Sequence, residues 1–380
     1  MDNERYPYQK SWRWYFVKAF DLVFDRFSKR LRETKFPSSV KNILVIRLDQ
    51  IGDLVCSLPV FPALKTRFPG AKITALVGEE GKAILDQNPF IDQLIVFRSN
   101  WFSRKKWSSP FEYFKILSLL RKSNYDLAFD LRGDLRNIVL ITLAGVRYRI
   151  GYGIAGGAGL LHHTAVYDEA LHQVELNLKL VTGEPVKRQN VKPEIYLRPE
   201  EKETALEKLS AFGISSKTSF IAIHPEAGYP SKEWEPEKFK GLMARLLLDP
   251  QKVILIFGLS EAQKLAESFH SSGRVFDLVG KVPLREMIAL LSQCCLFIGN
   301  DSGPSHIAQA LGIPAVVITS GTNEYEKWGI WREPSRILKN PVPCAPCHLK
   351  HCNVEGHPCM SQISPEQVSG VAEELIAEVA

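Results

Sequence analysis

The chain has 380 residues, of which 45% are hydrophobic and 24% are charged, and its formal net charge is +6 at pH 7. This composition excludes a disordered chain, and the length favours two domains of roughly 150 to 200 residues each. The modest positive charge suits an anionic substrate or a lipid surface and argues against a dedicated nucleic-acid binder.

The first residues carry no basic segment that leads into an apolar core, so no signal peptide is expected. No uncharged apolar run reaches the roughly 18 residues that a membrane-spanning helix needs. We therefore expect a cytoplasmic protein whose seven cysteines are reduced thiols or metal ligands and do not form disulfides.

Residues 10–35 are predicted to form an amphipathic helix within an N-terminal extension, residues 1–40. The apolar face holds Trp12, Phe16, Ala19, Phe20, Val23, Phe27 and Leu31, and the opposite face holds Lys10, Lys18, Lys29 and Arg32. This pattern is typical of a helix that lies in a membrane interface. The alternative is a helix that packs on its own domain or on a partner subunit.

Short apolar segments alternate with helical ones over residues 41–182. The predicted strands are 43–47, 73–77, 94–97, 127–131 and 148–152, and the predicted helices are 54–67, 111–122, 134–144 and 169–181. Such alternation predicts a mainly parallel sheet with helices on both faces. We therefore expect an N-terminal Rossmann-like domain.

Residues 183–199 contain one glycine and three prolines and are predicted to be a linker. A second Rossmann-like domain is predicted over residues 200–364, followed by a helix over 365–380 that is a candidate to pack back on the first domain. The predicted strands are 220–224, 253–257, 275–278, 296–299 and 315–319, and the helices are 200–212, 236–248, 261–269, 284–292 and 305–311. The fold class is therefore α/β, with two doubly wound domains expected to face each other across a cleft.

Three turns carry chemical groups. Residues 47–54 read RLDQIGDL; one glycine is too few for a dinucleotide fingerprint, but Asp53 follows a strand end, where α/β proteins keep their chemistry. Residues 297–306 read FIGNDSGPSH and predict an anion site at a helix N-terminus. Residues 224–234 read HPEAGYPSKEW, where Lys232 offers a cation to a phosphate. The alternatives are a first-turn Asp53 that favours the helix dipole and a solvated Lys232.

Together these turns resemble glycosyltransferase family 9, the bacterial heptosyltransferases that build the inner core of lipopolysaccharide. The matching segments lie at 43–64, 224–234 and 299–311, and the resemblance extends from about residue 41 to the C-terminus. It implies a GT-B architecture and an inverting enzyme that transfers heptose from ADP-heptose. The alternatives are another nucleotide sugar or acceptor on this fold, or a non-catalytic nucleotide-binding or metal-scaffold protein at the membrane.

The resemblance also implies roles for individual residues. Asp53 would be the catalytic base, Lys232 would contact the donor diphosphate, and Asp301 would bind the sugar. The other donor-binding candidates are Ser302, Gly303, Pro304, Ser305, His306 and, more weakly, Glu261. Arg132, Asp134 and Arg136 occupy the place of an acceptor loop, for which an internally paired surface turn is the alternative.

No cofactor is expected for catalysis, because a lysine and a helix terminus can stabilise the leaving diphosphate. The expected partners are an ADP-sugar, a lipopolysaccharide core or lipid A acceptor, and the cytoplasmic surface of the inner membrane, where the protein would be peripheral. The cysteine-rich loop, residues 341–360, is a separate signal. Its Cys344, Cys347, Cys352 and Cys359 are candidate ligands of a structural Zn²⁺ or Fe ion, and ordinary reduced thiols are the alternative.

Overall fold

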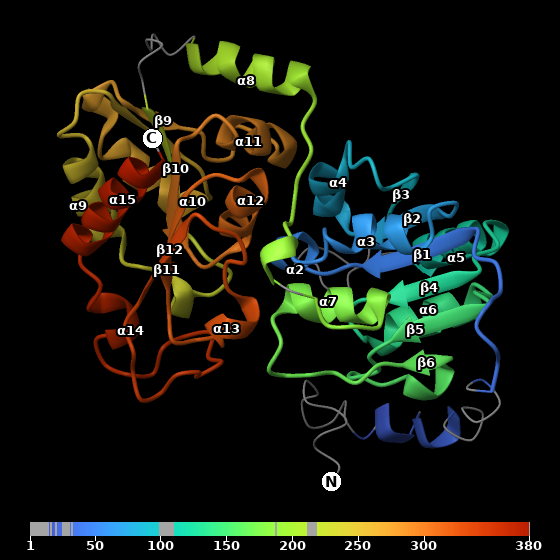
Figure 1. Ribbon diagram of the computed structural model, residues 1–380. Helices are drawn as coiled ribbons and strands as arrows, with labels where there is room; N and C mark the ends of the chain where they lie inside the picture. Colours follow the sequence, from blue (N-terminus) through green and yellow to red (C-terminus); the bar gives the residue numbers. More distant parts are fainter. Residues whose placement is uncertain are drawn as a thin grey trace. The chain divides into compact units, whose positions relative to one another are not determined.

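The protein is described here from a computed structural model, which covers residues 15, 17–19, 21–24, 31, 33–98, 110–186, 188–210 and 219–379. The chain divides into two compact units, Met1–Val191 and Lys192–Ala380. Each unit is built on one six-stranded sheet with helices packed around it (Figure 1). The α/β class with two doubly wound sheets is therefore confirmed.

The first unit has the strand order β3-β2-β1-β4-β5-β6, and all of its strand pairs are parallel. The strands are β1 (Asn42–Arg47), β2 (Lys72–Val77), β3 (Gln93–Val96), β4 (Leu127–Asp130), β5 (Tyr148–Gly151) and β6 (His163–Thr164). The helices are α2 (Ile51–Val55), α3 (Val60–Arg67), α4 (Glu79–Leu85), α5 (Pro110–Lys122), α6 (Leu135–Leu143) and α7 (Gln173–Thr182). Ile43 to Ile46 in β1 are at most 1% exposed, because helices cover both faces of a parallel sheet.

The second unit has the strand order β12-β11-β10-β7-β8-β9, again parallel throughout. The strands are β7 (Ser219–His224), β8 (Lys252–Ile256), β9 (Val275–Asp277), β10 (Leu296–Asn300), β11 (Ala315–Thr319) and β12 (Ser335–Lys339). The helices are α8 (Pro199–Ser210), α9 (Pro236–Leu246), α10 (Ser260–Glu267), α11 (Leu284–Leu291), α12 (Gly303–Leu311), α13 (Tyr325–Trp328), α14 (Pro358–Ser361) and α15 (Pro365–Val379).

Both sheets reverse their strand order at one point. In the first unit the chain moves outward from β1 through β2 and β3, and then returns to place β4 on the other side of β1. In the second unit the same reversal lies between β7 and β10. Ligands of open α/β sheets bind beyond the carboxyl ends of the strands at such switch points. A ligand site is therefore expected beyond the carboxyl ends of these four strands.

The C-terminal helix α15 corrects one prediction. It was a candidate to pack on the first domain, but its buried residues Val368, Ala372 and Leu375 belong to the core cluster of the second unit. Figure 1 shows α15 beside α9, and the two helices are in contact. The helix packs there because its apolar face covers one side of the sheet that contains β10, β11 and β12.

Most of the predicted helix 10–35 lies outside the described residues. Of its described residues, 15, 17–19, 21–24 and 31 are helical, whereas 33–35 are not. Val17 and Asp21 are buried, and Asp21 accepts a hydrogen bond from the Gly157 N–H at 2.7 Å, whereas Leu22 and Val23 are more than half exposed. One side of this segment thus packs on its own unit. No helix in the described part of the chain has the length and apolar character to span a membrane.

Candidate functional site

The first cluster lies where β10 ends and α12 begins. Ser302 precedes the helix with an extended backbone, and Pro304 stands in its first turn, where a residue without an N–H is tolerated. The Ser305 hydroxyl accepts a hydrogen bond from the Ser302 N–H at 3.3 Å and donates one to the Ser302 carbonyl oxygen at 2.6 Å. These bonds fix a tight turn at the positive end of the helix dipole, an arrangement that binds anions.

Lys232 and Asp301 lie together at this turn. Lys232 Nζ is 2.8 Å from Asp301 Oδ2, and the two side chains are 13% and 9% exposed. The neighbouring Asn300 holds the segment that carries the lysine: its Oδ1 accepts from the Trp234 N–H at 3.1 Å, and its Nδ2 donates to the Pro225 carbonyl oxygen at 2.6 Å. The sheet topology therefore delivers a cation to the N-terminus of α12.

His306 is a neutral hydrogen-bond donor within the same turn. Gln309 Oε1 accepts from the backbone N–H groups of Trp331 and Arg332 at 2.7 and 3.0 Å, so its Nε2 donates to His306 Nδ1 at 3.0 Å. The imidazole proton is thereby placed on Nε2, which lies 4.0 Å from Asp301 Oδ1. Burial lowers the pKa of His306 in spite of the nearby Asp301, which keeps the ring uncharged at neutral pH.

Three buried polar atoms near this turn form no hydrogen bond with any described residue. They are Ser302 Oγ, His224 Nδ1 and Thr319 Oγ1. Their residues stand at the carboxyl ends of β10, β7 and β11, which are neighbours in the sheet. Buried polar atoms are almost always paired in proteins. Their position at the switch point is that of a site that a polar ligand completes.

Asp53 lies in the first turn of α2, directly beyond the end of β1. Its Oδ1 is 3.2 Å from Nη2 of the buried Arg47, and its side chain is 19% exposed. Burial raises the pKa of Asp53, the positive charge of Arg47 opposes that rise, and the negative charge of Asp49 adds to it. Asp53 is thus a partly accessible carboxylate at the switch point of the first sheet, with the properties of a proton acceptor.

The predicted acceptor residues follow β4 at the same sheet edge. Asp134 caps the N-terminus of α6 and forms a two-point ion pair with Arg136, with both contacts at 2.8 Å. Arg132 Nη1 is 2.9 Å from Asp49 Oδ1. The side chains of Arg132 and Arg136 are 36% and 39% exposed, so both guanidinium groups remain reachable from solvent while they are paired.

Glu261 is an exposed residue that pairs with Lys264 at 2.7 Å. The buried carboxylate nearby is Glu226, which accepts hydrogen bonds from the N–H groups of Glu261 and Ala262 at 3.0 and 3.1 Å and also from that of Leu259. Glu226 therefore occupies the N-terminus of α10 from within the protein. At α12, no carboxylate of the described residues accepts hydrogen bonds from the first backbone N–H groups in this way.

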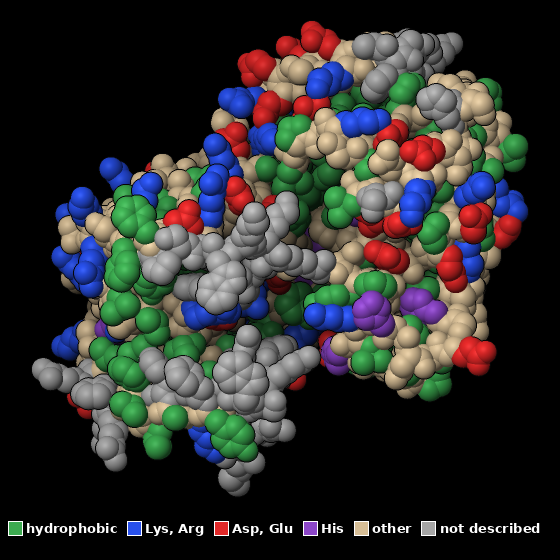
Figure 2. All heavy atoms as spheres, turned by 180° about the vertical axis from the view of Figure 1, so that it is seen from behind, with side chains coloured by type: hydrophobic (Ala, Val, Ile, Leu, Met, Phe, Trp, Pro, Cys, Tyr) green, Lys and Arg blue, Asp and Glu red, His purple; other side chains and the backbone are tan. Residues whose placement is uncertain are grey.

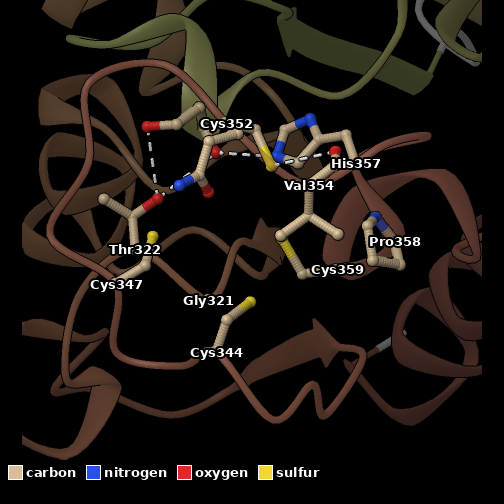
Figure 3. Close-up of a pocket in the computed structure, with 11 residues that line it drawn as sticks. Gly321, Thr322, Cys344, Cys347, Cys352, Val354, His357, Pro358 and Cys359 are labelled. Carbon is tan, nitrogen blue, oxygen red and sulfur yellow. Dashed lines mark hydrogen bonds between the residues drawn. The ribbon is translucent and has the colours of Figure 1, made fainter.

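The four cysteines of the 341–360 loop line one pocket. Figure 3 shows the sulfur atoms of Cys344, Cys347, Cys352 and Cys359 turned towards it. All four are free thiols. Within the residues that the structure describes, no group of three or more His, Cys, Asp or Glu side chains is placed to hold a metal ion. The prediction of a structural metal is therefore not supported by this arrangement.

The cysteine-rich loop packs against the turn that carries Lys232. The Ser231 N–H donates to the Lys350 carbonyl oxygen at 3.1 Å, and the Ser231 hydroxyl donates to the Leu349 carbonyl oxygen at 2.5 Å. His357 Nε2 donates to the Ser231 carbonyl oxygen at 3.1 Å (Figure 3). These contacts connect the pocket to the residue immediately before Lys232.

Two buried charged residues near these turns were not identified from the sequence. Arg47 and Glu226 each interact with groups that their local motifs do not identify. A charged residue at the end of a continuous apolar strand, as in ILVIR, is the signal that was available for Arg47. No comparable signal marked Glu226, because its partners in α10 lie 33 to 36 residues away.

The chain is similar to known glycosyltransferases. The family model described as glycosyltransferase family 9 (heptosyltransferase) matches residues 113–357. Lipopolysaccharide heptosyltransferase 3 of Escherichia coli is 26% identical over 296 residues, which cover 74% of this chain and 83% of that protein.

Two solved structures share the fold. E. coli ADP-heptose lipopolysaccharide heptosyltransferase II aligns with a TM-score of 0.72 at 22% identity, covering 89% of this chain and 99% of that one. A glycosyl transferase family 9 protein from Veillonella parvula aligns with a TM-score of 0.75 at 21% identity, covering 91% of this chain and 99% of that one.

Proposed function

Because the chain belongs to glycosyltransferase family 9, the heptosyltransferase family, we propose that it transfers heptose from ADP-heptose to the inner core of lipopolysaccharide. The fold is of the GT-B type, with two Rossmann-like units. The observation that carries the proposal for the donor is the position of Lys232 beside the N-terminus of α12, because a lysine and a helix N-terminus both favour a phosphate group. The curated relative acts, by its name, on lipopolysaccharide.

The proposed reaction is a single displacement with inversion. Asp53 accepts the proton of the acceptor hydroxyl while that oxygen bonds to the anomeric carbon of the sugar. The bond from the anomeric carbon to the diphosphate breaks at the same time, and ADP leaves with the electron pair. Lys232 and the N-terminus of α12 stabilise the charge on ADP, and Ser302 Oγ and His306 Nε2–H add hydrogen bonds to the phosphates or the sugar.

Asp53→Ala tests the role of the base. We expect transfer from ADP-heptose to fall by roughly 10²- to 10⁴-fold, with the affinity for ADP unchanged because Asp53 does not belong to the proposed donor site. Asp92→Ala is the matched control, since Asp92 is a partly exposed carboxylate of the same unit that pairs with Lys65. Transfer by Asp53→Ala at the normal rate would exclude Asp53 as the base.

The sugar and the acceptor need a direct assay. The protein is incubated with ADP-heptose and a panel of truncated lipopolysaccharides, and the products are identified by mass spectrometry. We expect one truncated inner-core acceptor to gain one heptose. Transfer from a different nucleotide sugar would point to the same fold with another substrate, and an absence of transfer from every donor would favour a non-catalytic nucleotide-binding protein.

We propose that the protein works as a peripheral protein on the cytoplasmic surface of the inner membrane, where such an acceptor presents its sugars. Large hydrophobic side chains are exposed in the first unit, among them Tyr15, Leu22, Phe111 and Phe114. Figure 2 shows hydrophobic and basic side chains next to each other on the face of this unit that is turned to the viewer. Both kinds of side chain favour an anionic lipid surface.

A deletion of residues 1–35 tests the membrane proposal. We expect the shortened protein to lose most of its binding to vesicles that contain anionic lipid. Its thermal midpoint is measured in parallel, because Val17 and Asp21 pack on the first unit. Unchanged vesicle binding by the folded, shortened protein would refute the proposal.

The four cysteines of the 341–360 loop are the candidate ligands of a structural Zn²⁺ or Fe ion, and reduced thiols are the alternative. They share one pocket but are not placed to hold a metal ion. Elemental analysis of the purified protein decides the question. About one Zn or Fe atom per chain would establish a structural metal site, and less than about one atom per ten chains would show that the cysteines are reduced thiols.

A further inference from the structure

Arg47 is a buried charge beside the proposed catalytic base. It ends β1 and is only 3% exposed. Its Nη1 donates a hydrogen bond to the Leu131 carbonyl oxygen at 2.7 Å. Its Nη2 donates to Asp53 Oδ1 at 3.2 Å, and its Nε lies 3.3 Å from Asp49 Oδ2. One guanidinium therefore contacts both the turn that carries the base and the end of the neighbouring strand β4.

We propose that Arg47 is the positioning residue of the reaction: it orients the Asp53 carboxylate through Oδ1 and keeps it ionised, so that Oδ2 accepts the proton of the acceptor hydroxyl. This inference rests on the proposed role of Asp53 as the base. Arg47 itself does not touch a substrate. It acts through its contact with Asp53.

The geometry gives Arg47 a fixed orientation. The bond from Nη1 to the Leu131 carbonyl oxygen anchors the guanidinium to the end of β4, with Nη2 turned towards Asp53. Since guanidinium is planar and rigid, it can make both bonds at once. A lysine has a single nitrogen and cannot hold Leu131 and Asp53 with the same geometry.

The charges around Asp53 act in opposite directions. Arg47 from β1 and Arg132 from the loop after β4 favour the carboxylate, whereas Asp49 from the same turn disfavours it. Asp130 at the end of β4 and Asp134 at the start of α6 are the other acidic groups of this network; Asp130 acts on Arg47, and Asp134 pairs with Arg132 and Arg136. The removal of Arg47 and the removal of Asp49 should therefore shift the ionisation of Asp53 in opposite senses.

The test compares the pH profiles of two variants. Transfer requires ionised Asp53, so activity rises with pH through the apparent pKa of that group. We expect Arg47→Gln to lower kcat by about 10- to 100-fold and to move the acidic limb of the profile upward by roughly one pH unit. We expect Asp49→Asn to move the same limb to lower pH. Arg47→Lys should bring the acidic limb of the pH profile part of the way back to its normal pH, because the positive charge is restored. It should restore less of kcat, because a lysine does not make the two hydrogen bonds of the guanidinium.

Arg149→Gln is the control for the loss of a buried arginine. Arg149 lies in β5 of the same sheet and donates to the carbonyl oxygens of Leu160 and Val146, both at 2.8 Å. No carboxylate pairs with it among the described residues, and it is remote from Asp53 in the strand order. We expect a lowered thermal midpoint with the acidic limb unmoved.

The outcomes separate this inference from the proposed function. If Asp53→Ala abolishes transfer but Arg47→Gln leaves the acidic limb and kcat unchanged, the assignment of Arg47 is wrong and the base remains. If Asp53→Ala is fully active, the assignment of Asp53 as the base is wrong, and the role proposed for Arg47 is wrong as well. In a third outcome, kcat falls and the acidic limbs of Arg47→Gln and Asp49→Asn move in the same direction. Arg47 would then have a structural role only.

Discussion

Single buried residues set the chemistry of both switch points. Lys232 and Asp301 neutralise each other where a diphosphate is proposed to bind. A buried pair of this kind is costly to break, because the remaining charge loses its partner. The lysine is therefore held in place by a carboxylate until an anionic ligand competes for its three donor hydrogens.

Lys232→Ala should weaken ADP binding by roughly 10- to 100-fold, which corresponds to about 1.4 to 2.7 kcal/mol. It should also lower the thermal midpoint, since Asp301 is left unpaired. In the double variant Lys232→Ala/Asp301→Asn we expect the midpoint to recover while ADP binding stays weak. Calorimetric titration with ADP measures the first effect and thermal unfolding the second; normal ADP affinity in Lys232→Ala would contradict the donor role.

Asp130 supplies a prediction about pH. Burial raises its pKa to about 7, so between about pH 4, near its ordinary value, and pH 7 the folded protein holds a proton that the unfolded chain has lost. The contribution of Asp130 to stability is complete at the acidic end of this range and is lost as the pH rises through it.

The variant Asp130→Asn does not titrate there. Its thermal midpoint, measured relative to the parent protein, should therefore rise by roughly 3 °C or more between pH 5 and pH 8. A constant offset is also expected, because the amide replaces a carboxylate that accepts bonds from the Asp134 N–H and Asn137 Nδ2. Parallel curves for the two proteins would show that Asp130 keeps an ordinary pKa.

At the scale of elements, the sequence predicts the central strands well, but it predicts poorly where helices begin and where they break. All ten predicted strands are present, because buried parallel strands appear as continuous apolar runs. The strands β6 and β12 and the helices α4, α13 and α14 are not among the predicted elements. The predicted helix 54–67 is two helices, α2 and α3, separated by a turn before Val60 that contains Pro59. Helix α7 starts at Gln173, four residues later than predicted, because the side chain of His172 caps it.

The candidate site shows the same division. The sequence places Asp53, Lys232, Asp301 and the turn at 302–306 in polar segments that follow apolar strands, and the family resemblance supplies their proposed roles. Their buried partners were not found from the sequence, because contacts such as that of Arg47 with Leu131 join residues 84 positions apart. Local motifs show where a side chain leaves the sheet and do not show which distant group balances its charge.

The cysteine-rich loop leads to an element-scale prediction. Ser231 receives three contacts from this loop, so Ser231→Ala should loosen the turn that carries Lys232. We expect a three- to tenfold loss of ADP affinity with a small change in thermal midpoint, in line with the loss of one hydrogen bond. Ser292→Ala is the matched control, since its hydroxyl bonds the nearby Ala289 carbonyl oxygen. Equal ADP affinities in the two variants would show that the loop does not contribute to donor binding.

At the scale of the whole molecule, each unit has its own buried core. The second unit buries Ile221, Trp234 and Phe239 together with α15, and the first buries Leu44, Leu76 and Leu120. The described donor candidates all lie in the second unit. Residues 192–380 expressed alone should therefore fold cooperatively and bind ADP within about threefold of the full chain. An unfolded fragment, or a folded one that does not bind ADP, would show that donor binding needs the first unit.

The packing of α15 also has a consequence for synthesis. The first unit is complete once residue 191 has been made, and domains commonly fold in order from the N-terminus while translation continues. The second unit needs its last helix to close its core. On the ribosome, the unit that carries Asp53 can therefore mature early, whereas the unit proposed to bind the donor completes its core only after residues 365–379 have emerged.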